Sequence, residues 1–538
     1  MDPEFVDLDV LSSTTLASDV VDSLRDAGQE RLYQVGDVLF EAGKAHEAFW
    51  YLVDATVCIV DPTVNRSGFV VAPGQFLGEL GLLQQQKAVL TAKVDSPGRI
   101  LRVSLDAFRT LIETNPQASD AIITAFTARR QRMLRKGLGG LTLLADESDK
   151  AILAVRQFAA RNRIPHRCIG PDSNEAQAFK NQFGLRLDQP VAIFGDGSVI
   201  EAPQPATVAA RLGAELTIDD DTAFDLVVVG GGPSGLAAAV YGASEGLKTL
   251  VVEATAIGGQ AGTSSRIENY LGFPTGISGG DLCWRGEIQA AKFGARFLLP
   301  RRVTALHTGQ PTHVLQLDND RELHARAVVV ACGVQYRKLP IDRLEQFEGA
   351  GIFYSATELE ARLCRNGTPV VIGGGNSAGQ AAMYLAETSA HVHMLVRADS
   401  LGDSMSEYLS QRLLTHPRIS VHYEVEMMAL NGDRRLQSIE IRNRANGVVD
   451  SLETNAVFVM IGAAAYTDWL GPDVKRDKRG FVLTGDQVNR ATSPFATTCP
   501  GVYAVGDVRT NSVKRVASAV GEGSVVVSSI HQYLSSLA

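Results

Sequence analysis

The pattern of hydrophobic and polar positions divides the chain into regions of different structure. Short alternating runs at 49–53 and 56–60, among glycine turns, predict a β-rich first region. From 105 to 135 the pattern becomes helical, and we expect one long helix there. From 224 onward, β-branched apolar runs alternate with helical segments. That alternation predicts an α/β architecture for the second half of the chain.

A small unit lies between these regions, at 141–213. The predicted elements are a strand at 141–144, a helix at 150–162, a strand at 165–169, a helix at 174–183, a strand at 191–194, a turn at 195–197, and a last strand and helix. This order predicts a separate α/β fold.

Composition and charge exclude several classes of protein. With 538 residues the chain is too long for one hydrophobic core, and its 45% hydrophobic and 21% charged residues are ordinary for a globular protein. The net charge of −9 argues against general nucleic-acid binding. Glycines and polar residues interrupt the longest apolar stretches, and no basic segment precedes an apolar one at the N-terminus. We therefore expect no membrane span and no secretory leader.

The cysteines are informative through their spacing. None forms a CxxC pair, and none clusters with histidine at the spacing of a zinc site. We therefore expect no metal site and a reduced, cytoplasmic setting. The six are Cys58, Cys168, Cys283, Cys332, Cys364 and Cys499.

Two glycine-rich loops predict nucleotide binding. Each follows a β-branched run and opens an Ala-rich segment, which is the strand–turn–helix setting of a dinucleotide fingerprint. The glycines allow a tight turn and let backbone N–H groups approach a diphosphate, which lies at the positive end of the helix. The loop residues are Gly230, Gly232, Pro233, Ser234 and Gly235 in the first loop, and Gly373, Gly375, Asn376, Ser377 and Ala378 in the second.

The residues that follow the two loops predict that each loop binds a different nucleotide. Glu253 stands at the end of the strand after the first loop, where a carboxylate can accept hydrogen bonds from both ribose hydroxyls of an adenine nucleotide. Arg397 stands at the corresponding strand end after the second loop, where a cation can pair with a 2′-phosphate. The first loop therefore suits FAD or NAD, and the second favours NADPH over NADH.

Several motifs in the second half resemble thioredoxin reductases. Residues 258–260 and 267–274 look like the flavin-contacting segments of that family, 331–333 resembles its ATG turn, and 501–508 matches its second flavin motif. Residues 514–516 and 521–523 resemble its closing helix. The resemblance implies an FAD domain formed by 224–340 and 464–538, with a nicotinamide domain at 341–463 inserted between its two parts.

The resemblance also implies cofactor contacts. In the family, the residue at the position of Asp507 bonds the ribityl chain of the flavin. Thioredoxin reductases usually carry further arginines after the one matched by Arg397, where this chain has Ala398 and Gly402. Besides the loops, Glu253 and Arg397, the expected contacts are Gly259, Gln260, Asn269, Ala331, Gly333, Gly506, Asp507, Arg515 and Val516 for FAD, and Ile461, Gly462 and Lys514 for NADPH.

The dithiol of thioredoxin reductases is missing from the matching position. Ser355 and Glu358 occupy the two places of that family's CxxC pair. Neither forms a disulfide, and a serine hydroxyl is far too weakly acidic to replace a thiolate. No catalytic side chain is therefore assigned, and we expect electrons to pass from the flavin to an external acceptor. A ferredoxin, a flavodoxin, a quinone, a disulfide protein and oxygen all stay open as acceptors.

Residues 30–135 resemble cyclic-nucleotide-binding domains of the catabolite-activator type. The resemblance rests on 36–40, Gly43, 73–83 and Thr91-Ala92. The pocket that it implies consists of Gly78, Glu79, Leu80 and Thr91. Leu90 replaces the arginine that binds the cyclic phosphate, and it offers neither charge nor donor; Lys87 could substitute only along a changed loop path. We therefore favour a retained barrel that serves interaction or dimerisation over a barrel that binds a cyclic nucleotide. The helix at 105–135 is long enough to pair with a second copy of the chain, which fits a homodimer.

Residues 141–213 resemble thioredoxins or glutaredoxins. Pro190 stands where that family has its cis-proline, and Asp196-Gly197 matches the following hairpin turn. The family's CxxC pair belongs near 146–149, where this sequence has no cysteine. We therefore expect a structural spacer or a docking platform without thioredoxin chemistry.

Together these expectations describe a multidomain flavoprotein. A β-barrel with its helix, resembling a cyclic-nucleotide-binding domain, spans 6–137, a small thioredoxin-like α/β unit spans 141–213, and two Rossmann-like three-layer domains follow. We expect an oxidoreductase that takes hydride from NADPH onto FAD. Two alternatives stay open: a disulfide reductase that uses other thiols, and a nucleotide or redox sensor regulated through its N-terminal unit.

Overall fold

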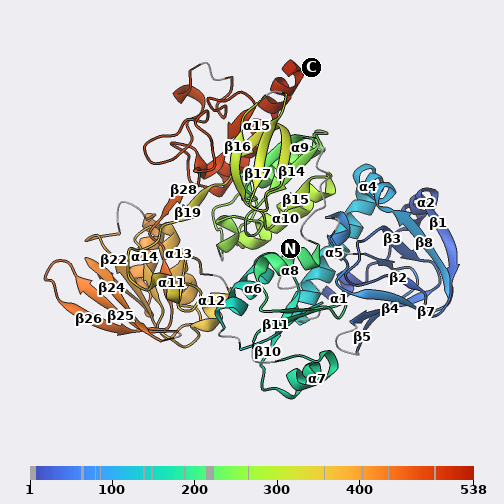
Figure 1. Ribbon diagram of the computed structural model, residues 1–538, viewed down its shortest axis with the longest axis horizontal. Coiled ribbons are helices and arrows are strands. Elements are labelled where there is room, and N and C mark those ends of the chain that lie inside the picture. Colours follow the sequence, from blue (N-terminus) through green and yellow to red (C-terminus); the bar gives the residue numbers. More distant parts are fainter. Residues whose placement is uncertain are drawn as a thin grey trace.

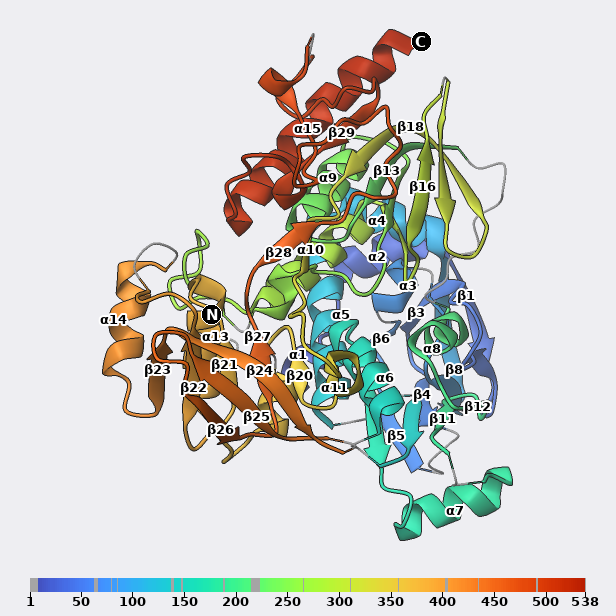
Figure 2. The same ribbon diagram turned by 60° about the vertical axis from the view of Figure 1, so that its left-hand side comes forward.

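The structure is a computed structural model of the chain. It describes residues 8–61, 66–78, 80–84, 86–136, 140–146, 149–186, 189–213, 223–264, 266–309, 311–356, 358–401, 405–433, 435–489 and 492–537. We distinguish a barrel unit (8–136), a thioredoxin-like unit (140–213), an outer Rossmann domain (223–336 with 463–537) and an inserted Rossmann domain (337–462). Figures 1 and 2 show the barrel unit in blue, the thioredoxin-like unit in teal and the inserted domain in orange.

Two antiparallel four-stranded sheets form the barrel unit, in the orders β1-β8-β3-β6 and β2-β7-β4-β5. Their facing side chains, among them Leu52, Val57 and Ala92, fill an apolar interior. The elements are α1 (Leu8–Ser12), α2 (Ser18–Ala27), β1 (Gly28–Tyr33), β2 (Val38–Phe40), β3 (Ala48–Leu52), β4 (Thr56–Asp61), β5 (Arg66–Val71), β6 (Phe76–Leu77), α3 (Leu80–Leu83), β7 (Thr91–Ser96) and β8 (Gly98–Ser104).

The expected long helix at 105–135 is two helices, α4 (Leu105–Thr114) and α5 (Pro116–Lys136), so the prediction of one helix is wrong. The break lies at Asn115, whose side-chain oxygen accepts a 3.0 Å hydrogen bond from the backbone N–H of Ala118. Proline lacks a backbone N–H, fits the first turn of a helix, and disfavours helical geometry in the residue before it. Pro116 therefore starts a new helix.

The thioredoxin-like unit has the sheet order β10-β9-β11-β12, with β9 and β10 parallel and the other pairs antiparallel. Asp149 lies in the segment to which the resemblance assigns a CxxC pair, and its carboxylate caps α6 by accepting from the N–H groups of Ala151 and Ile152 at 2.9 and 3.1 Å. The elements are β9 (Leu141–Leu144), α6 (Lys150–Arg161), β10 (His166–Ile169), α7 (Asn174–Phe183), β11 (Val191–Phe194), β12 (Val199–Glu201) and α8 (Pro205–Leu212).

One feature expected of this unit is absent. Among the described residues the cis peptide bond is Leu299–Pro300 in the outer Rossmann domain, so the bond before Pro190 is trans. Pro190 thus differs from the cis-proline that thioredoxins have at this position, although the predicted strands and helices of the unit are present.

The outer Rossmann domain is built on a sheet in the order β15-β14-β13-β18-β17-β16, with β29 also paired to β18. Strands β13, β14, β15, β18 and β29 run parallel, and α9, α10 and α15 pack against the sheet. The elements are β13 (Ala223–Val229), α9 (Pro233–Ser244), β14 (Thr249–Val252), α10 (Gly279–Lys292), β15 (Arg296–Leu298), β16 (Val303–His307), β17 (His313–Leu317), β18 (Glu322–Val330), β29 (Val502–Ala504) and α15 (Val516–Leu537).

The inserted Rossmann domain has a parallel sheet in the order β20-β27-β21-β22-β23, covered on one face by the antiparallel sheet β24-β25-β26. The elements are α11 (Leu344–Phe347), β20 (Ile352–Phe353), α12 (Glu358–Leu363), β21 (Val370–Ile372), α13 (Asn376–Leu385), β22 (Val392–Val396), α14 (Glu407–Thr415), β23 (Ile419–Tyr423), β24 (Val425–Gly432), β25 (Leu436–Asn443), β26 (Val449–Glu453) and β27 (Val457–Val459).

The two Rossmann domains are joined by a pair of short strands. β19 (Val334–Tyr336) leads into the inserted domain and β28 (Ala463–Ala465) leads out of it, and the two pair antiparallel. The chain therefore crosses between the domains twice at one place, as an insertion requires. The barrel unit packs on the outer domain, because one apolar cluster runs from Phe49 and Phe126 to Trp284 and Ile288 of α10.

The helices of the described residues are short or polar relative to the apolar thickness of a bilayer. None of them is long and apolar enough to cross a membrane.

Candidate functional site

The first glycine loop lies at the carboxyl end of β13, between β14 and β18. Such a switch in strand order is where open α/β sheets bind ligands. A Cβ on Gly230 would overlap the carbonyl oxygen of Ala331, and a Cβ on Gly235 would overlap that of Gly230. Gly232 ends the loop before α9, and the nearest atom to a Cβ built there is 3.9 Å away, the Cα of Gly259. The loop is thus tight against the sheet and open in front of the helix, as a diphosphate requires.

Glu253 follows β14 and faces this loop. Its carboxylate accepts hydrogen bonds from the backbone N–H groups of Gly231 at 2.8 Å and Thr255 at 2.9 Å. These bonds fix the side chain at the rim of the loop. A carboxylate held there is placed for the ribose of an adenine nucleotide.

The C-terminal helix α15 completes the same site from the other end of the sequence. A Cβ on Gly523 would overlap the carbonyl oxygen of Ser234, so α15 packs directly on the first turn of α9. Gly506 has a φ of +75°, and a Cβ there would meet the Ser234 hydroxyl at 2.6 Å. Burial raises the pKa of the next residue, Asp507, against the opposing charge of Lys514 and a hydrogen bond from Ser512.

An ion pair that the sequence reasoning did not assign holds this corner together. Glu522 of α15 accepts from the backbone N–H of Gly506 at 2.6 Å and from Arg509 at 2.5 and 3.0 Å. Both side chains are at most 16% exposed, and Arg509 also donates to the Thr484 hydroxyl at 3.0 Å. Glu522 lies in the 521–523 motif. No motif in the sequence around Arg509 or Thr484 predicts that these residues contact it.

The other residues expected to contact FAD lie around these two segments. Gln260 donates a 2.5 Å hydrogen bond to the carbonyl oxygen of Val334, which ties its segment to the interdomain strand β19. Gly333 has a φ of +59° directly after β18. Asn269 is exposed, as is Arg515, and Val516 begins α15. Lys514, expected at NADPH, lies 5.4 Å from the ring of Phe481 in the outer domain.

These residues fit FAD. In front of α9 the nearest atom to a Cβ on Gly232 is a backbone atom, the carboxylate of Glu253 lies at the rim of the loop, and the half-buried carboxyl of Asp507 lies on the adjoining segment. The donors and the acceptor that an adenine dinucleotide needs are therefore on one edge of the sheet.

The second glycine loop repeats this geometry at β21, which lies between β22 and β27. Gly373 has a φ of +144°, and a Cβ there would overlap the carbonyl oxygen of Met460. Gly375 precedes α13, and Ala378 in the first turn of this helix is fully buried. The oxygen of Asn376 accepts from the backbone N–H and the hydroxyl of Ser406, at 2.8 and 3.1 Å, and Ser377 is exposed.

Arginines gather at the end of β22. Arg397 is exposed there, and its carbonyl oxygen accepts a 3.1 Å hydrogen bond from Arg444. Glu426 pairs with Arg442 at 2.5 Å and with Arg444 at 4.0 Å, and the Arg442 hydrogen bond is the largest cause that lowers the pKa of this carboxyl. Arg442 and Arg444 come from the end of β25 and the turn after it. They supply positive charge that Ala398 does not.

The remaining residues expected at NADPH lie at the exit of the inserted domain. Gly462 has a φ of +89°, and its carbonyl oxygen accepts from the backbone N–H of Arg337 at 2.9 Å. Ile461 packs against the apolar cluster beneath β24–β26. Both residues thus belong to the segment that leads into β28.

The two positions that the resemblance assigns to a dithiol lie at the start of α12. Ser355 is in the bend before this helix, and Glu358 is its first residue. None of the six cysteines forms a disulfide. Burial raises the pKa of Cys332 and of Cys283 to about 12 and that of Cys364 to about 11. The thiol of Cys332 also donates to the carbonyl oxygen of Tyr466 at 3.1 Å.

The cyclic-nucleotide pocket expected in the barrel unit is partly described. Gly78 has a φ of +130°, Leu80 begins α3, and the hydroxyl of Thr91 accepts from the backbone N–H of Ala42 at 3.0 Å. Leu90 packs against the apolar interior of the barrel. Glu79 lies outside the described residues.

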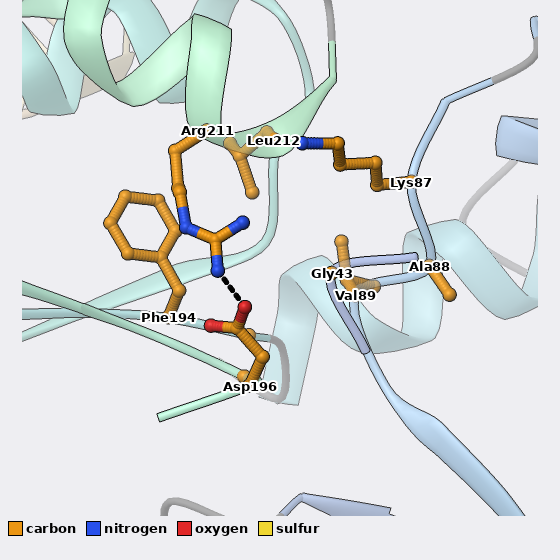
Figure 3. A pocket seen from close by; sticks show the side chains of 10 residues that line it. Gly43, Lys87, Ala88, Val89, Phe194, Asp196, Arg211 and Leu212 are labelled. Carbon is orange, nitrogen blue, oxygen red and sulfur yellow. Dashed lines mark hydrogen bonds and ion pairs between the residues drawn. The ribbon is translucent and has the colours of Figure 1, made fainter. Parts of the chain in front are cut away.

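The thioredoxin-like unit covers the segment before Thr91. A Cβ on Gly140 or on Gly195 would overlap the carbonyl oxygen of Val89. The space left at this interface is only ≈ 10 Å³, about one water molecule. Figure 3 shows Lys87 extended across the interface toward Leu212, and Arg211 turned to its ion-pair partner Asp196. Lys87 therefore points out of the barrel.

Comparison with known proteins identifies the second half of the chain. The profile of the pyridine nucleotide-disulphide oxidoreductases matches residues 224–523, and that of the cyclic nucleotide-binding domain matches residues 30–115. The chain belongs to the pyridine nucleotide-disulphide oxidoreductase family. Within this family it is a thioredoxin reductase-like, FAD- and NADPH-dependent oxidoreductase, joined to a cyclic nucleotide-binding domain.

Individual relatives agree with this assignment. A thioredoxin reductase of Treponema pallidum is 32% identical over 318 residues, which is 59% of this chain and 99% of the relative. Two crystal structures, of the thioredoxin reductases of Lactococcus lactis and T. acidophilum, each share 28% identity with a TM-score of 0.53. They cover 58% and 59% of this chain, and 99% of each solved chain is matched.

Proposed function

We propose that this oxidoreductase takes hydride from NADPH at the second glycine loop onto FAD at the first, and passes the electrons to an external acceptor without a dithiol of its own. FAD supplies the chemistry, because it accepts hydride and releases single electrons or electron pairs. The protein binds and orients the two cofactors and keeps them on separate domains that meet at β19 and β28.

The observation that carries the proposal is that no cysteine stands at the start of α12. Ser355 and Glu358 stand where thioredoxin reductases carry their cysteines, and Cys364, the nearest cysteine, is only 1% exposed. Its raised pKa keeps the thiol protonated at neutral pH, whereas the thiolate is the form that attacks a disulfide. This supports an outlet directly from the flavin rather than through sulfur.

Four other cysteines support the same conclusion. Burial is the largest cause that raises the pKa of Cys58, Cys283, Cys332 and Cys499. A disulfide reductase that uses one of these thiols would need a thiolate and a second sulfur beside it. The second alternative, a sensor without turnover, is favoured by Leu90, which cannot bind a phosphate, and opposed by the complete set of FAD residues.

Arg397 and its neighbours support NADPH as the donor. Arg397 stands at the strand end where the 2′-phosphate of NADPH belongs, and the guanidinium of Arg444 lies against its carbonyl oxygen. The acceptor class stays open between a ferredoxin, a flavodoxin, a quinone, oxygen and a disulfide protein. A homodimer and a cytoplasmic setting are part of the proposal, and the lack of disulfides among the six cysteines supports the second.

Anaerobic reduction tests the proposal. The full chain, loaded with FAD, should lose its yellow colour when NADPH is added, and a panel of oxidants should then restore the colour. Turnover with a quinone, a ferredoxin or a flavodoxin is the expected result and excludes a pure sensor. A flavin that stays oxidised under NADPH, or turnover with a disulfide that thiol alkylation abolishes, would contradict it.

A further inference from the structure

One helix of the thioredoxin-like unit lies across both Rossmann domains. Leu153, Gln157 and Arg161 of α6 are four residues apart, so they lie along one face of the helix. Ile152, Val155 and Ala159 belong to the core of the thioredoxin-like unit. The stripe 153–157–161 is therefore directed away from its own unit.

The first part of this stripe contacts the inserted domain at α12. Leu153 is 4% exposed and belongs to the apolar cluster of that domain, with Ala356, Ala361 and Cys364. Four residues later, the side-chain amide of Gln157 donates a 3.2 Å hydrogen bond to the carboxylate of Glu360. The contact is thus made on the helix that follows Ser355, where thioredoxin reductases carry their dithiol.

The end of α6 contacts the outer domain at the segment after Glu253. The guanidinium of Arg161 donates to the carbonyl oxygen of Gly259 at 3.5 Å, and the amide of Asn162 donates to that of Thr255 at 3.3 Å. These two bonds hold both ends of the segment 255–259. Its Gly259 is the residue that faces Gly232 across the loop in front of α9.

The next residue adds a stronger contact to the same domain. Arg163 pairs with Asp281 of α10, and its guanidinium lies 4.4 Å from the ring centre of Trp284. A cation above an aromatic face and beside a carboxylate is a stable arrangement in a half-buried site. The end of α6 is therefore fixed to the outer domain at three successive residues.

We propose that the thioredoxin-like unit is a built-in docking partner of the two Rossmann domains. Its helix α6 closes the face of α12 that stands in place of the dithiol, and it positions the flavin segment 255–259 through Arg161 and Asn162. The second part rests on the proposed binding of FAD at the first glycine loop. Arg161 and Asn162 are positioning residues, because they act on FAD through the backbone of this segment.

Affinity for FAD tests the positioning role. Removing both hydrogen bonds in the full chain, with Arg161→Ala and Asn162→Ala together, should raise the Kd for FAD by about tenfold. The measurement is the quenching of flavin fluorescence when FAD is titrated into apoprotein. Lys180→Ala, an exposed cation on α7 of the same unit, is the matched control and should keep the original Kd. An unchanged Kd in the double variant, with an unchanged circular dichroism spectrum, would overturn this part. A native chain that binds no FAD would instead overturn the proposed function.

Exchange of the amides of α12 tests the docking. Leu153→Asp places a charge in the contact and should speed hydrogen–deuterium exchange in peptides that cover 358–363. Ala154→Asp, on the next and exposed residue, should leave that exchange unchanged. Equal exchange in both variants would overturn the docking.

A cross-link tests the same contact without a destabilising charge. With Gln157→Cys and Glu360→Cys, a short bismaleimide should bridge the two positions in high yield, as identified by mass spectrometry of the digested chain. With Ala154→Cys and Glu360→Cys the yield should be low. Equal yields would show that α6 is not docked on α12.

Discussion

The side-chain amide of Gln84 donates a 2.6 Å hydrogen bond to the carboxyl of Glu287. Gln84 directly follows α3 of the barrel unit, and Glu287 lies on α10 of the outer Rossmann domain. Burial raises the pKa of this carboxyl to about 7, against the opposing effects of the Gln84 hydrogen bond and the charges of Arg130 and Arg163. One titratable group therefore lies where the barrel unit, the thioredoxin-like unit and the outer domain meet.

Glu287 should make the stability of this junction depend on pH. Below its ordinary pKa of 4.5 the carboxyl is protonated in both the folded and the unfolded chain. Because the folded pKa is raised, the proton stabilises the folded chain, and this contribution is lost as the pH rises through about 7. Glu287→Gln keeps a hydrogen-bond acceptor for Gln84 and removes the titration. At about pH 8 it should be more stable than the native chain by about 3 kcal/mol, and at about pH 4 equally stable.

Thermal unfolding of both proteins across this pH range measures the effect. Glu407→Gln, which changes an exposed carboxyl on α14, is a suitable control. The same pH profile for the native chain and Glu287→Gln would contradict the prediction.

Two glycines of α15 should respond differently to alanine. At Gly523 a Cβ overlaps the carbonyl oxygen of Ser234, so Gly523→Ala must move α15 away from α9 and from the first glycine loop. At Gly521 no atom lies within 4 Å, and alanine there should stabilise the helix by about 0.5–1 kcal/mol. We expect Gly523→Ala to lose FAD on gel filtration and Gly521→Ala to keep it. Retention of FAD by both variants would mean that the close packing of α15 on α9 is not needed.

The arginines at the end of β22 should set the preference between nicotinamide donors. Arg397→Ala removes a charge-assisted contact to the 2′-phosphate, so the KM for NADPH should rise about tenfold while the KM for NADH stays unchanged. Arg365→Ala, an exposed arginine in the loop after α12, should change neither. The measurement is the initial rate of flavin reduction against donor concentration. Equal changes for the two donors would exclude a role in recognising the phosphate.

The sequence predicted those parts of the site that depend on neighbours along the chain. The glycine loops, Glu253 and Arg397 each follow a strand within a few residues or at a known spacing, and the structure places them at the carboxyl ends of β13, β14, β21 and β22. The break between α4 and α5 is also predictable from the sequence, because the proline at position 116 disfavours a continuous helix. That error came from following hydrophobic periodicity alone.

The parts that the sequence did not predict depend on pairs of residues from distant segments. Arg444 reaches Arg397 from the turn after β25, Arg509 meets Glu522 across the start of α15, and Leu153 leaves its own unit to join the core of another. The sequence around a leucine in an amphipathic helix does not show whether it packs in its own unit or against another domain. The fold determines these contacts, and no local pattern identifies them.

The barrel unit should bind neither cAMP nor cGMP. Leu90 offers no donor to a cyclic phosphate, and Lys87 points toward the thioredoxin-like unit instead of into the barrel. Titration calorimetry with either nucleotide should show no heat, and the melting temperature should not change. Heat with a saturable isotherm would show that another group replaces the missing arginine.

The contact between Val89 and Gly195 should hold the thioredoxin-like unit on the barrel unit. Gly195→Ala places a methyl group where the carbonyl oxygen of Val89 lies, so the bend that carries Val89, just before β7, must shift. Gly170→Ala, in the same unit, has no atom within 4 Å of its new Cβ and is the matched control. We expect faster hydrogen–deuterium exchange around 86–90 in Gly195→Ala and none of this change in Gly170→Ala. Equal exchange at 86–90 in both variants would contradict the prediction. It would show that the close packing at Gly195 does not hold the two units together.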